Sequence, residues 1–417
     1  MSRKFPNFLA AYAAYADDKF VPPQFNVWAA LSIIAGALDR KVWLPWGDRY
    51  SFYPNIYVLL VSKPGVGKSV ALNNAVDLLR EMNRRTSTIN IMPSQVTEAK
   101  FIELMGAGRS FTDRSSGKEL TVFQNSGYYF ASEASNSLRN IFGEFIACLT
   151  DFYDCPSSWE RATKSSGKIE LKNVCMNILA GSTFDYLGKL VSDDNIQGGF
   201  ASRLLYVVHD EKLVRRQKFQ GGLNGPEAKQ LRAAYREAMV ADLTEINAIT
   251  GPMSADAEFS AAWEAWYPVN EEKRQAFQSE KLQSIMARTN TNVIKLSILL
   301  SAAESNDRIL RLRHWEQAVA LVEGVNAHIP GIFREAQANA GPRAKSGNPL
   351  ANLIIRAVQQ GHTLTVIRSM AIVQDFNAQR VDATIKALID DGTLEGGAAV
   401  AGQGVRLRVK GDPNKHL

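Results

Sequence analysis

The segment from Ile56 to Ser69 constrains the fold of this chain more than any other part of the sequence. An apolar run, Ile-Tyr-Val-Leu-Leu-Val, leads into the small-residue loop Ser-Lys-Pro-Gly-Val-Gly-Lys-Ser, and apolar residues then recur at helical spacing from Leu72 to Leu79. Glycines in such a loop let backbone N–H groups converge on phosphate oxygens, and the N-terminus of the following helix favours an anion. The segment therefore predicts a buried strand, a phosphate-binding loop and an amphipathic helix.

Each position of this loop has an expected role toward a nucleotide. Lys68 is expected to reach the β- and γ-phosphates as a catalytic residue, and the Ser69 hydroxyl to ligate a metal ion, so the cofactors would be ATP and Mg²⁺. Ser62 stands where such loops usually begin with glycine, and we interpret it as a tolerated variant. A Gly-rich turn that matches by chance is the alternative. The predicted nucleotide-binding residues are Pro64, Gly65, Val66, Gly67, Lys68, Ser69 and Val70.

Nucleotide hydrolysis also requires a group that activates water. The run Tyr-Tyr-Phe-Ala-Ser-Glu that ends at Glu133 reads as a strand finishing in an acid, as a Walker B element does. Glu133 is the predicted catalytic carboxylate and the second metal-binding residue. Ser132 replaces the acid that usually precedes it, which would weaken contact with magnesium. Alternatively Glu133 is a solvated residue at a strand end, with Asp151 and Asp154 in reserve.

Length and periodicity divide the 417 residues into regions, and such a length is typical of two or three domains. Residues 1–50 read as an N-terminal helical collar, 51–215 alternate short apolar strands with helices, and 216–338 read as helices throughout. Short apolar strands joined by helices predict a mostly parallel sheet covered on both faces, hence an α/β fold. The expected strands are Ile56–Val61, Ser87–Ile91, Tyr128–Ser132, Cys175–Gly181 and Leu204–His209.

A linker rich in glycine and proline, residues 339–349, predicts a domain boundary. In the region 350–410 beyond it, helices are expected at Leu350–Gln360, Ile367–Phe376 and Gln379–Asp390, followed by a Gly-rich hairpin. This order predicts a C-terminal winged helix-turn-helix, a module that binds DNA or docks onto proteins. The side chains that it would offer to DNA are Gln379, Arg380, Lys386, Arg406, Arg408 and Lys410.

Charge and hydropathy limit the binding partners and the cellular compartment to be expected. The 48 Lys and Arg against 42 Asp and Glu give a net charge of +6, which is compatible with a polyanionic partner but does not demonstrate one. The longest apolar stretches fall short of the roughly 20 residues that span a bilayer. The three cysteines have no metal-ligand spacing. We therefore expect no membrane partner and a location in the cytoplasm.

Beyond the loop, four segments are similar to those of a known family. They are Phe25-Asn-Val-Trp-Ala-Ala-Leu-Ser, Tyr53-Pro-Asn-Ile-Tyr-Val-Leu-Leu-Val, Gly199-Phe-Ala-Ser-Arg-Leu-Leu-Tyr-Val, and Arg288 with Val293-Ile-Lys-Leu-Ser. Over residues 5–335 the chain resembles the helicase-type P-loop ATPase domain of phage and plasmid primase–helicase proteins, itself similar to AAA+ and superfamily-three helicases that act as rings. The resemblance implies a P-loop AAA+-like parallel sheet core and a homo-oligomeric ring, a hexamer by family precedent, with any primase on another chain. It also implies that the cytoplasm is that of a bacterial host cell.

The same resemblance assigns roles to three residues near later strands. In AAA+ ATPases the strand beside the Walker B strand carries a polar sensor of the γ-phosphate, which Ser182 or Thr183 would provide here. Either residue could instead merely cap the next helix. Arg203 would be a catalytic guanidinium that reaches the γ-phosphate bound by the neighbouring subunit. The alternative is an arginine held in a structural ion pair.

A basic hairpin is expected between Trp159 and Lys172, with its tip at residues 165–168. In superfamily-three relatives a hairpin before the sensor lines the central pore, so these cations would contact the DNA backbone without reading its sequence. A solvated surface hairpin is the alternative. The predicted DNA-binding residues are Arg161, Lys164, Lys168 and Lys172.

These expectations combine into two hypotheses. The first is an ATP-dependent DNA helicase or translocase of a phage or mobile-element replication system, acting as a ring that hydrolyses ATP between subunits on single-stranded or forked DNA. The second is an ATP-switched replication initiator or helicase loader that binds DNA without unwinding it, which the loss of an acid at Ser132 and the winged helix favour. A small-molecule kinase would not need the basic hairpin and the winged helix together.

Overall fold

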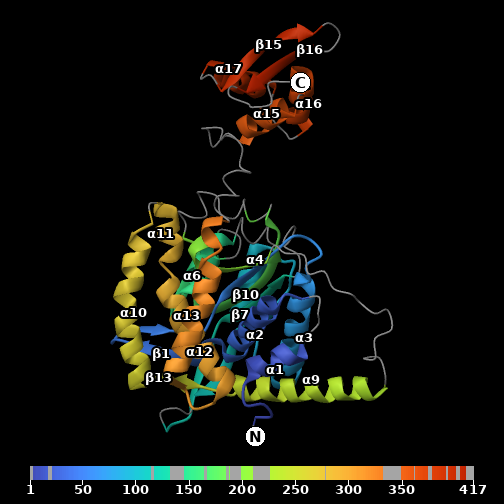
Figure 1. Ribbon diagram of the computed structural model, residues 1–417. Coiled ribbons are helices and arrows are strands. Elements are labelled where there is room, and N and C mark those ends of the chain that lie inside the picture. The colour runs from blue at the N-terminus through green and yellow to red at the C-terminus, as the bar shows by residue number, and fades with distance from the viewer. Residues whose placement is uncertain are drawn as a thin grey trace. The chain divides into compact units, whose positions relative to one another are not determined.

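The computed structural model divides the chain into two compact units, residues 1–339 and 340–417. It describes residues 3–16, 21–113, 117–131, 145–163, 167–184, 187, 199–209, 226–277, 279–331, 349–360, 362–373, 378–390, 393–400 and 404–409. The first unit holds all three of the regions that periodicity separated before the linker (Figure 1).

The first unit is mixed α/β, built on a five-stranded parallel sheet in the order β11-β3-β10-β7-β4. The strand after which the loop follows, β3, lies between β11 and β10. Four of the five expected strands are present, whereas the one expected at Ser87–Ile91 is replaced by a strand of only two residues, Ile91–Met92. The sheet strands are β3 (Tyr57–Val61), β4 (Ile91–Met92), β7 (Ser126–Ala131), β10 (Cys175–Ser182) and β11 (Leu204–Val208).

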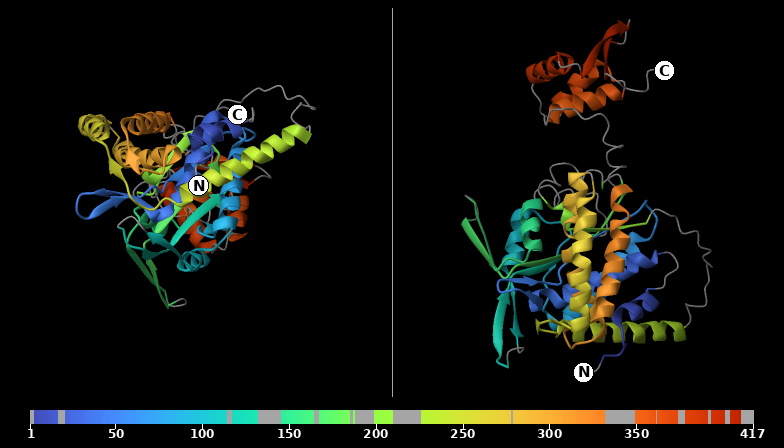
Figure 2. Two further views of the ribbon diagram at one scale, coloured as in Figure 1. Left: turned by 90° about the horizontal axis from the view of Figure 1, so that it is seen from below. Right: turned by 60° about the vertical axis from the view of Figure 1, so that its left-hand side comes forward.

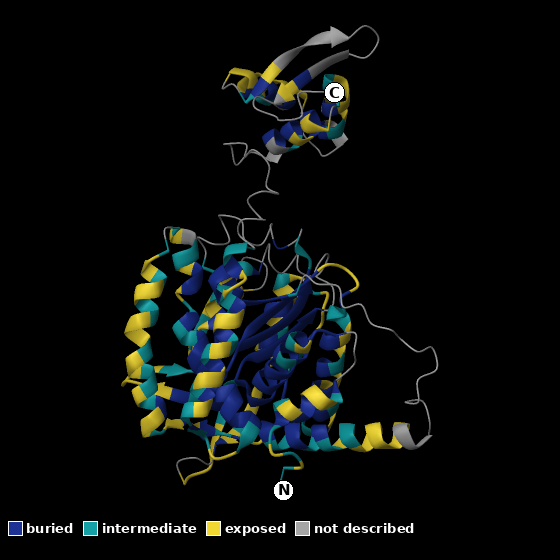
Figure 3. Cartoon of the chain, in the orientation of Figure 1, coloured by how far each residue is buried: buried dark blue, intermediate teal, exposed yellow. Residues whose placement is uncertain are grey.

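Alternation along the strands divides the core into two layers. Val58 and Leu60 of β3 pack into one cluster, whereas Tyr57, Leu59 and Val61 of the same strand pack into the other. A strand that is apolar at every position can bury both faces in this way, which is typical of a parallel sheet covered by helices. Figure 3 shows this sheet as the buried centre of the unit.

One face of the sheet is covered by helices from both ends of the unit. Helix α2 packs against α3, α9, α12 and three sheet strands. These helices are α1 (Phe8–Tyr15), α2 (Pro23–Leu38), α3 (Lys68–Thr86), α9 (Pro226–Asn247), α12 (Thr289–Glu304) and α13 (Leu312–Asn326). The opposite face is covered by α4 (Glu98–Gly106), α6 (Ile146–Tyr153) and α11 (Glu280–Met286).

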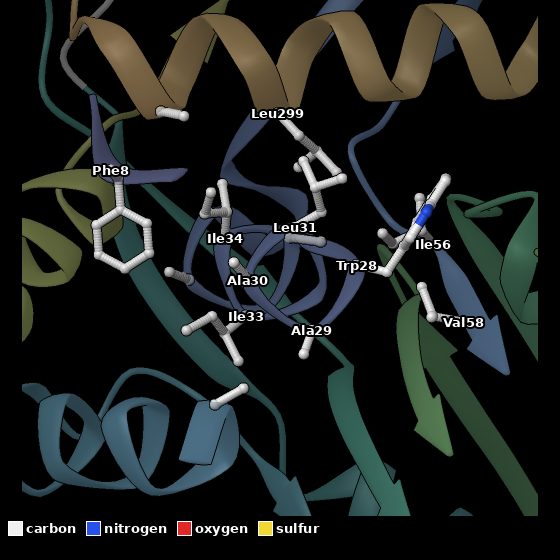
Figure 4. Packing of buried hydrophobic residues seen from close by; sticks show 14 of the residues in the cluster. Phe8, Trp28, Ala29, Ala30, Leu31, Ile33, Ile34, Ile56, Val58 and Leu299 are labelled. Carbon is white, nitrogen blue, oxygen red and sulfur yellow. The ribbon is translucent and has the colours of Figure 1, made fainter. Parts of the chain in front are cut away.

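Helix α2 is apolar on nearly every side, so it is buried on nearly every side. Figure 4 shows Leu31 and Ile34 of this helix beneath Leu299 of α12. On the sheet side, Gly36 allows a close approach, because a Cβ there would lie 2.6 Å from the Tyr128 ring. Helix α2 is therefore an interior layer of this unit and not a peripheral collar.

Two sequence expectations, that residues 1–50 and residues 216–338 are helical, are corrected by short strands. Region 1–50 contains β1 (Val42–Trp46), which pairs with β2 (Tyr50–Phe52) through a turn at Gly47. The helical region 216–338 contains β12 (Gly251–Pro252), β13 (Ser254–Ala255) and β14 (Ile309–Leu310) beside α10 (Ala257–Gln275). Because β12 pairs in parallel with β1, the first and third regions are joined in one sheet. The last strand, β14, pairs with β13.

Two hairpins extend from the body of the unit (Figure 2). The first, β5 (Arg109–Asp113) with β6 (Leu120–Gln124), was not expected. The second, β8 (Ser158–Thr163) with β9 (Gly167–Lys172), is the expected basic hairpin.

The second unit consists of three helices and an antiparallel strand pair around its own apolar cluster. Its helices begin one to three residues from the expected positions. They are α15 (Pro349–Gln359), α16 (Leu364–Val373) and α17 (Ala378–Asp390), followed by β15 (Leu394–Val400) and β16 (Gly404–Val409). The described residues of the two units contain no helix long and apolar enough to cross a membrane.

Candidate functional site

The predicted phosphate loop lies at the carboxyl edge of the parallel sheet, where β3 ends and α3 begins. Gly65 and Gly67 have φ angles of +83° and +82°, a backbone conformation that glycine adopts without steric cost. Gly67 is also the N-cap of α3. The carboxyl edge of an open α/β sheet is where such folds bind ligands, and a loop opening a helix there is suited to an anion.

The ammonium of Lys68 folds back over the loop. Its Nζ donates to the carbonyl oxygen of Ser62 and to the Ser62 hydroxyl, each at 2.8 Å, and to the carbonyl oxygen of Lys63 at 3.0 Å. Ser62, which stands where such loops usually have glycine, is fully buried. Its hydroxyl donates to the Lys63 carbonyl oxygen within the loop. The serine variant therefore supplies an extra acceptor to the lysine.

The candidate sensor lies directly beside the loop. Ser182 pairs with Val61 at the end of β3, and the Ser62 N–H donates to the Ser182 carbonyl oxygen at 3.4 Å. Ser182 is buried and its hydroxyl bonds to the Thr183 carbonyl oxygen at 3.3 Å. The structure thus brings both sensor candidates to the carboxyl edge.

Glu133 and Ser132 lie outside the described residues. The last described residue of β7, Ala131, pairs with Ala180 of β10, two residues before Ser182. The strand that leads to Glu133 therefore runs toward the same edge as the loop. The reserve acid Asp154 has different surroundings, in an ion-pair cluster beyond the opposite edge.

Arg203 lies at the amino edge of the sheet, one residue before β11. Leu204 pairs with Tyr57, the first residue of β3, so the length of β3 separates Arg203 from the loop. At about 3.3 Å per residue this is on the order of 13–16 Å. The side chain is 9% exposed, and Arg203 Nη2 is 2.5 Å from Asp154 Oδ2.

The cluster around Arg203 was not found from the sequence. Asp154 also binds Arg288, whose Nη1 lies 3.0 Å from Asp154 Oδ1. Both guanidinium groups lie within 6 Å of the Tyr153 ring centroid, and Lys295 Nζ lies 4.0 Å from it. Three cations and one carboxylate thus surround one aromatic ring.

Lys295 is buried within this cluster. Its Nζ donates to Asn55 Oδ1 at 2.5 Å, to the Asn55 carbonyl oxygen at 3.1 Å and to the Tyr153 carbonyl oxygen at 3.4 Å. Burial lowers the pKa of Lys295 to about 8, because removal from water disfavours the charged ammonium. The sequence indicated Lys295 and Arg288 in one way only, because both lie in segments that are similar to those of the primase–helicase family.

A further residue at the carboxyl edge is His209, at the end of the expected strand Leu204–His209. Its N–H donates to the Val61 carbonyl oxygen at 2.9 Å, and its ring packs edge-on against Phe25. Its Nε2 is buried and has no hydrogen-bond partner among the described residues. Its position directly after β11 was the available signal, because residues that follow parallel strands gather at this edge.

The hairpin charges are largely neutralised by nearby acids. Arg161 is bound to Glu98 of α4 at 2.6 Å, and Lys168 to Glu160 on the facing strand at 2.9 Å. Lys172 lies 3.6 Å from Glu170, whereas Lys164 lies outside the described residues. Lys168 and Lys172 remain more than 60% exposed, and exposed pairs of this kind exchange partners at little cost.

No protein-family model matches the sequence, and no curated protein matches it. The described residues also contain no group of three or more His, Cys, Asp and Glu side chains that could hold a metal ion.

Proposed function

We propose that this chain is an ATP-dependent DNA helicase or translocase of a phage or mobile-element replication system. The observation that carries the proposal is the loop between β3 and α3, with two left-handed glycines and a lysine at the carboxyl edge of a parallel sheet. A backbone shaped in this way binds phosphate.

The loop fits ATP with Mg²⁺. Lys68 would exchange its bonds to loop carbonyl oxygens for the β- and γ-phosphates, and the Ser69 hydroxyl would hold the metal. Bound Mg²⁺ neutralises phosphate charge during transfer to water. Glu133 would orient that water, and Ser182 or Thr183 beside the loop would bond to the γ-phosphate.

The strand order supports the AAA+-like assignment. Strand β10 lies between β3, which leads into the loop, and β7, which leads toward Glu133. A sensor strand beside the Walker B strand is what the resemblance to AAA+ ATPases implies. The N-terminal part of the chain contributes to this core through α2.

The position of Arg203 supports a site shared between subunits. Since Arg203 and the loop lie at opposite edges of the sheet, Arg203 does not reach the loop of its own chain. A ring that places one subunit's amino edge against the next subunit's carboxyl edge would bring Arg203 of one subunit to the loop of the next. We propose that the γ-phosphate of ATP bound to the neighbouring subunit then replaces Asp154 as the partner of Arg203 and Arg288. One anion would thus be exchanged for another.

Two basic elements support DNA as the substrate. The β8–β9 hairpin would contact the phosphate backbone through Lys164, Lys168 and Lys172, while Arg161 is engaged with Glu98. The second unit has the helix and hairpin order of a winged helix, with exposed Lys386 and Arg408 as candidate contacts. A primase or another replication protein is a further partner that the resemblance implies.

An ATP-switched initiator or loader is the second candidate, favoured by the compact second unit that would bind DNA without requiring turnover. Unwinding of a forked duplex separates the two functions. We expect strand displacement that requires ATP hydrolysis and that single-stranded DNA stimulates the ATPase. ATP-dependent DNA binding with no displacement, and an ATPase rate unaffected by DNA, would favour the loader and overturn the helicase.

A further inference from the structure

A cavity of about 310 Å³ lies where three separated segments of the first unit meet, on β1, on residues 253–255 and on the first half of α10. Figure 1 shows β1, β13 and α10 next to one another. The described residues of the phosphate loop and of the β8–β9 hairpin do not line this cavity. The lining residues are Leu44, Pro45, Trp46, Met253, Ser254, Ala255, Phe259, Ser260, Trp263 and Glu264.

Two indole rings form a corner of the cavity. The Trp46 and Trp263 ring centroids lie 5.4 Å apart with the ring planes at 81°. Trp46 is held by Phe52 at 5.2 Å, and Trp263 by Trp266 at 5.8 Å and Tyr267 at 5.5 Å. Because each ring is fixed by further aromatic contacts, the corner is formed before any ligand arrives. Trp46 is nevertheless 38% exposed, so part of its ring is accessible to a ligand.

Of the described residues that line the cavity, only Glu264 is charged. It follows Trp263 directly on α10 and is exposed. Among the described residues it forms no ion pair, in contrast to Glu271 two turns further along, which binds Arg274. The cavity therefore combines aromatic walls with one uncompensated negative charge.

From this combination we propose that the cavity binds a small organic cation whose charged nitrogen carries apolar groups, such as a quaternary ammonium. Aromatic faces attract such cations through their quadrupole, and the apolar substituents fill the space between the rings. A carboxylate at the rim adds attraction for a cation and repels phosphates. The volume is at the small end of the range typical of ligand pockets, which suits a ligand of this size. This site is independent of the proposed nucleotide site.

The test compares choline with its neutral isostere 3,3-dimethyl-1-butanol. Saturation-transfer NMR on the methyl protons of each compound would report binding to the full chain at constant ionic strength. We expect choline to bind and the neutral compound to bind at least about fivefold more weakly, because the cation–π contribution is lost. Equal binding of the two compounds, or no binding of choline, would overturn the proposal.

Two variants locate the binding. Glu264→Gln should weaken choline binding by about threefold, the scale of an exposed ion pair. Glu272→Gln removes the same charge from an exposed position on the same helix outside the cavity and should leave binding unchanged. Choline that binds E264Q as well as the wild type would contradict the assignment, whereas equal weakening in both variants would indicate only a general charge effect and overturn it.

Discussion

The two edges of the five-stranded sheet carry opposite arrangements of charge. At the carboxyl edge, Lys68 is bound by neutral oxygens of a glycine-containing loop. At the amino edge, Arg203 and Arg288 are bound by the carboxylate of Asp154. At the first edge, a phosphate group can replace the neutral loop oxygens that bind the lysine, whereas at the second edge a carboxylate must be exchanged for the phosphate. Under the proposed function, one chain would hold two halves of a phosphate site that its own fold keeps apart.

The largest effect is expected at the carboxyl edge. Lys68→Ala should reduce ATP hydrolysis to the background of the assay, because the β- and γ-phosphates lose their only predicted lysine contact. The fold should be retained, since Lys68 lies where the loop meets α3 and its ammonium bonds to loop oxygens of Ser62 and Lys63. Phosphate release measured beside a far-ultraviolet circular dichroism melt checks both statements. An unchanged hydrolysis rate would remove the loop from the site.

The amino edge is tested next. Arg203→Ala should slow hydrolysis by about a thousandfold, the contribution typical of an arginine supplied by a partner. Asp154 would stay paired with Arg288, so the cluster keeps one ion pair. Arg236→Ala, which breaks an ion pair with Glu81 elsewhere in the unit, is the matched control and should keep the rate.

Mixing distinguishes a shared site from a structural role for Arg203. Equal amounts of K68A and R203A should recover roughly a quarter of the wild-type rate, because about one interface in four would pair an intact loop with an intact arginine. If the mixture stays as inactive as either variant while R203A subunits exchange and fold normally, Arg203 acts only as an ion pair within its own chain.

The sequence was sufficient to predict the loop at the carboxyl edge of the sheet but not the ion-pair cluster at the amino edge. The loop, β3 and α3 are contiguous, so local periodicity and glycine placement were sufficient to predict them. The cluster of Asp154, Arg203 and Arg288 joins side chains that are 49 and 134 positions apart, and no local pattern reports such a meeting.

Short elements were missed for the same reason. Strand β1 contains Pro45 and pairs with β12 about two hundred residues later, so its partner is invisible to a local pattern. The prediction of a strand at Ser87–Ile91 was largely wrong because α3 continues to Thr86. Ser87 is the C-cap of this helix, with a φ of +53°. In the second unit, strong amphipathic periodicity placed all three helices within a few residues.

The DNA-binding surface is expected to show a smaller effect. Lys164→Ala/Lys168→Ala should abolish stimulation of the ATPase by single-stranded DNA while leaving the unstimulated rate unchanged. Loss of two phosphate contacts should also reduce the slope of log affinity against log salt by about 1.4. Fluorescence anisotropy with a labelled oligonucleotide measures the affinity at each salt concentration. The control variant is Lys229→Ala/Lys273→Ala, at exposed positions on α9 and α10. Normal stimulation in the hairpin variant would place DNA elsewhere.

The smallest effect concerns Lys295 at the amino edge. Its pKa of about 8 in the folded chain lies below the ordinary value of 10.5, so the unfolded chain binds more protons between these values. Stability should therefore rise with pH in this window. From pH 7.5 to 9.5 the free energy of unfolding of the wild type should increase by about 1–2 kcal/mol relative to Lys295→Met.

Urea unfolding followed by tryptophan fluorescence measures this difference, since all seven tryptophans precede residue 340 and report on the first unit. Lys229→Met, at an exposed position, should show no such dependence relative to the wild type. A difference between wild type and K295M that is constant with pH would mean that Lys295 keeps an ordinary pKa in the folded chain.

The most direct test of the account is equilibrium binding of ATP with Mg²⁺ to the wild type, K68A and R203A. If the carboxyl edge binds the phosphates and the amino edge acts only on the transferred group, K68A should bind ATP at least about tenfold more weakly, while R203A binds within about twofold of the wild type and hydrolyses almost none. Wild-type affinity in K68A, or loss of binding in a folded R203A alone, would contradict the assignment of the two edges.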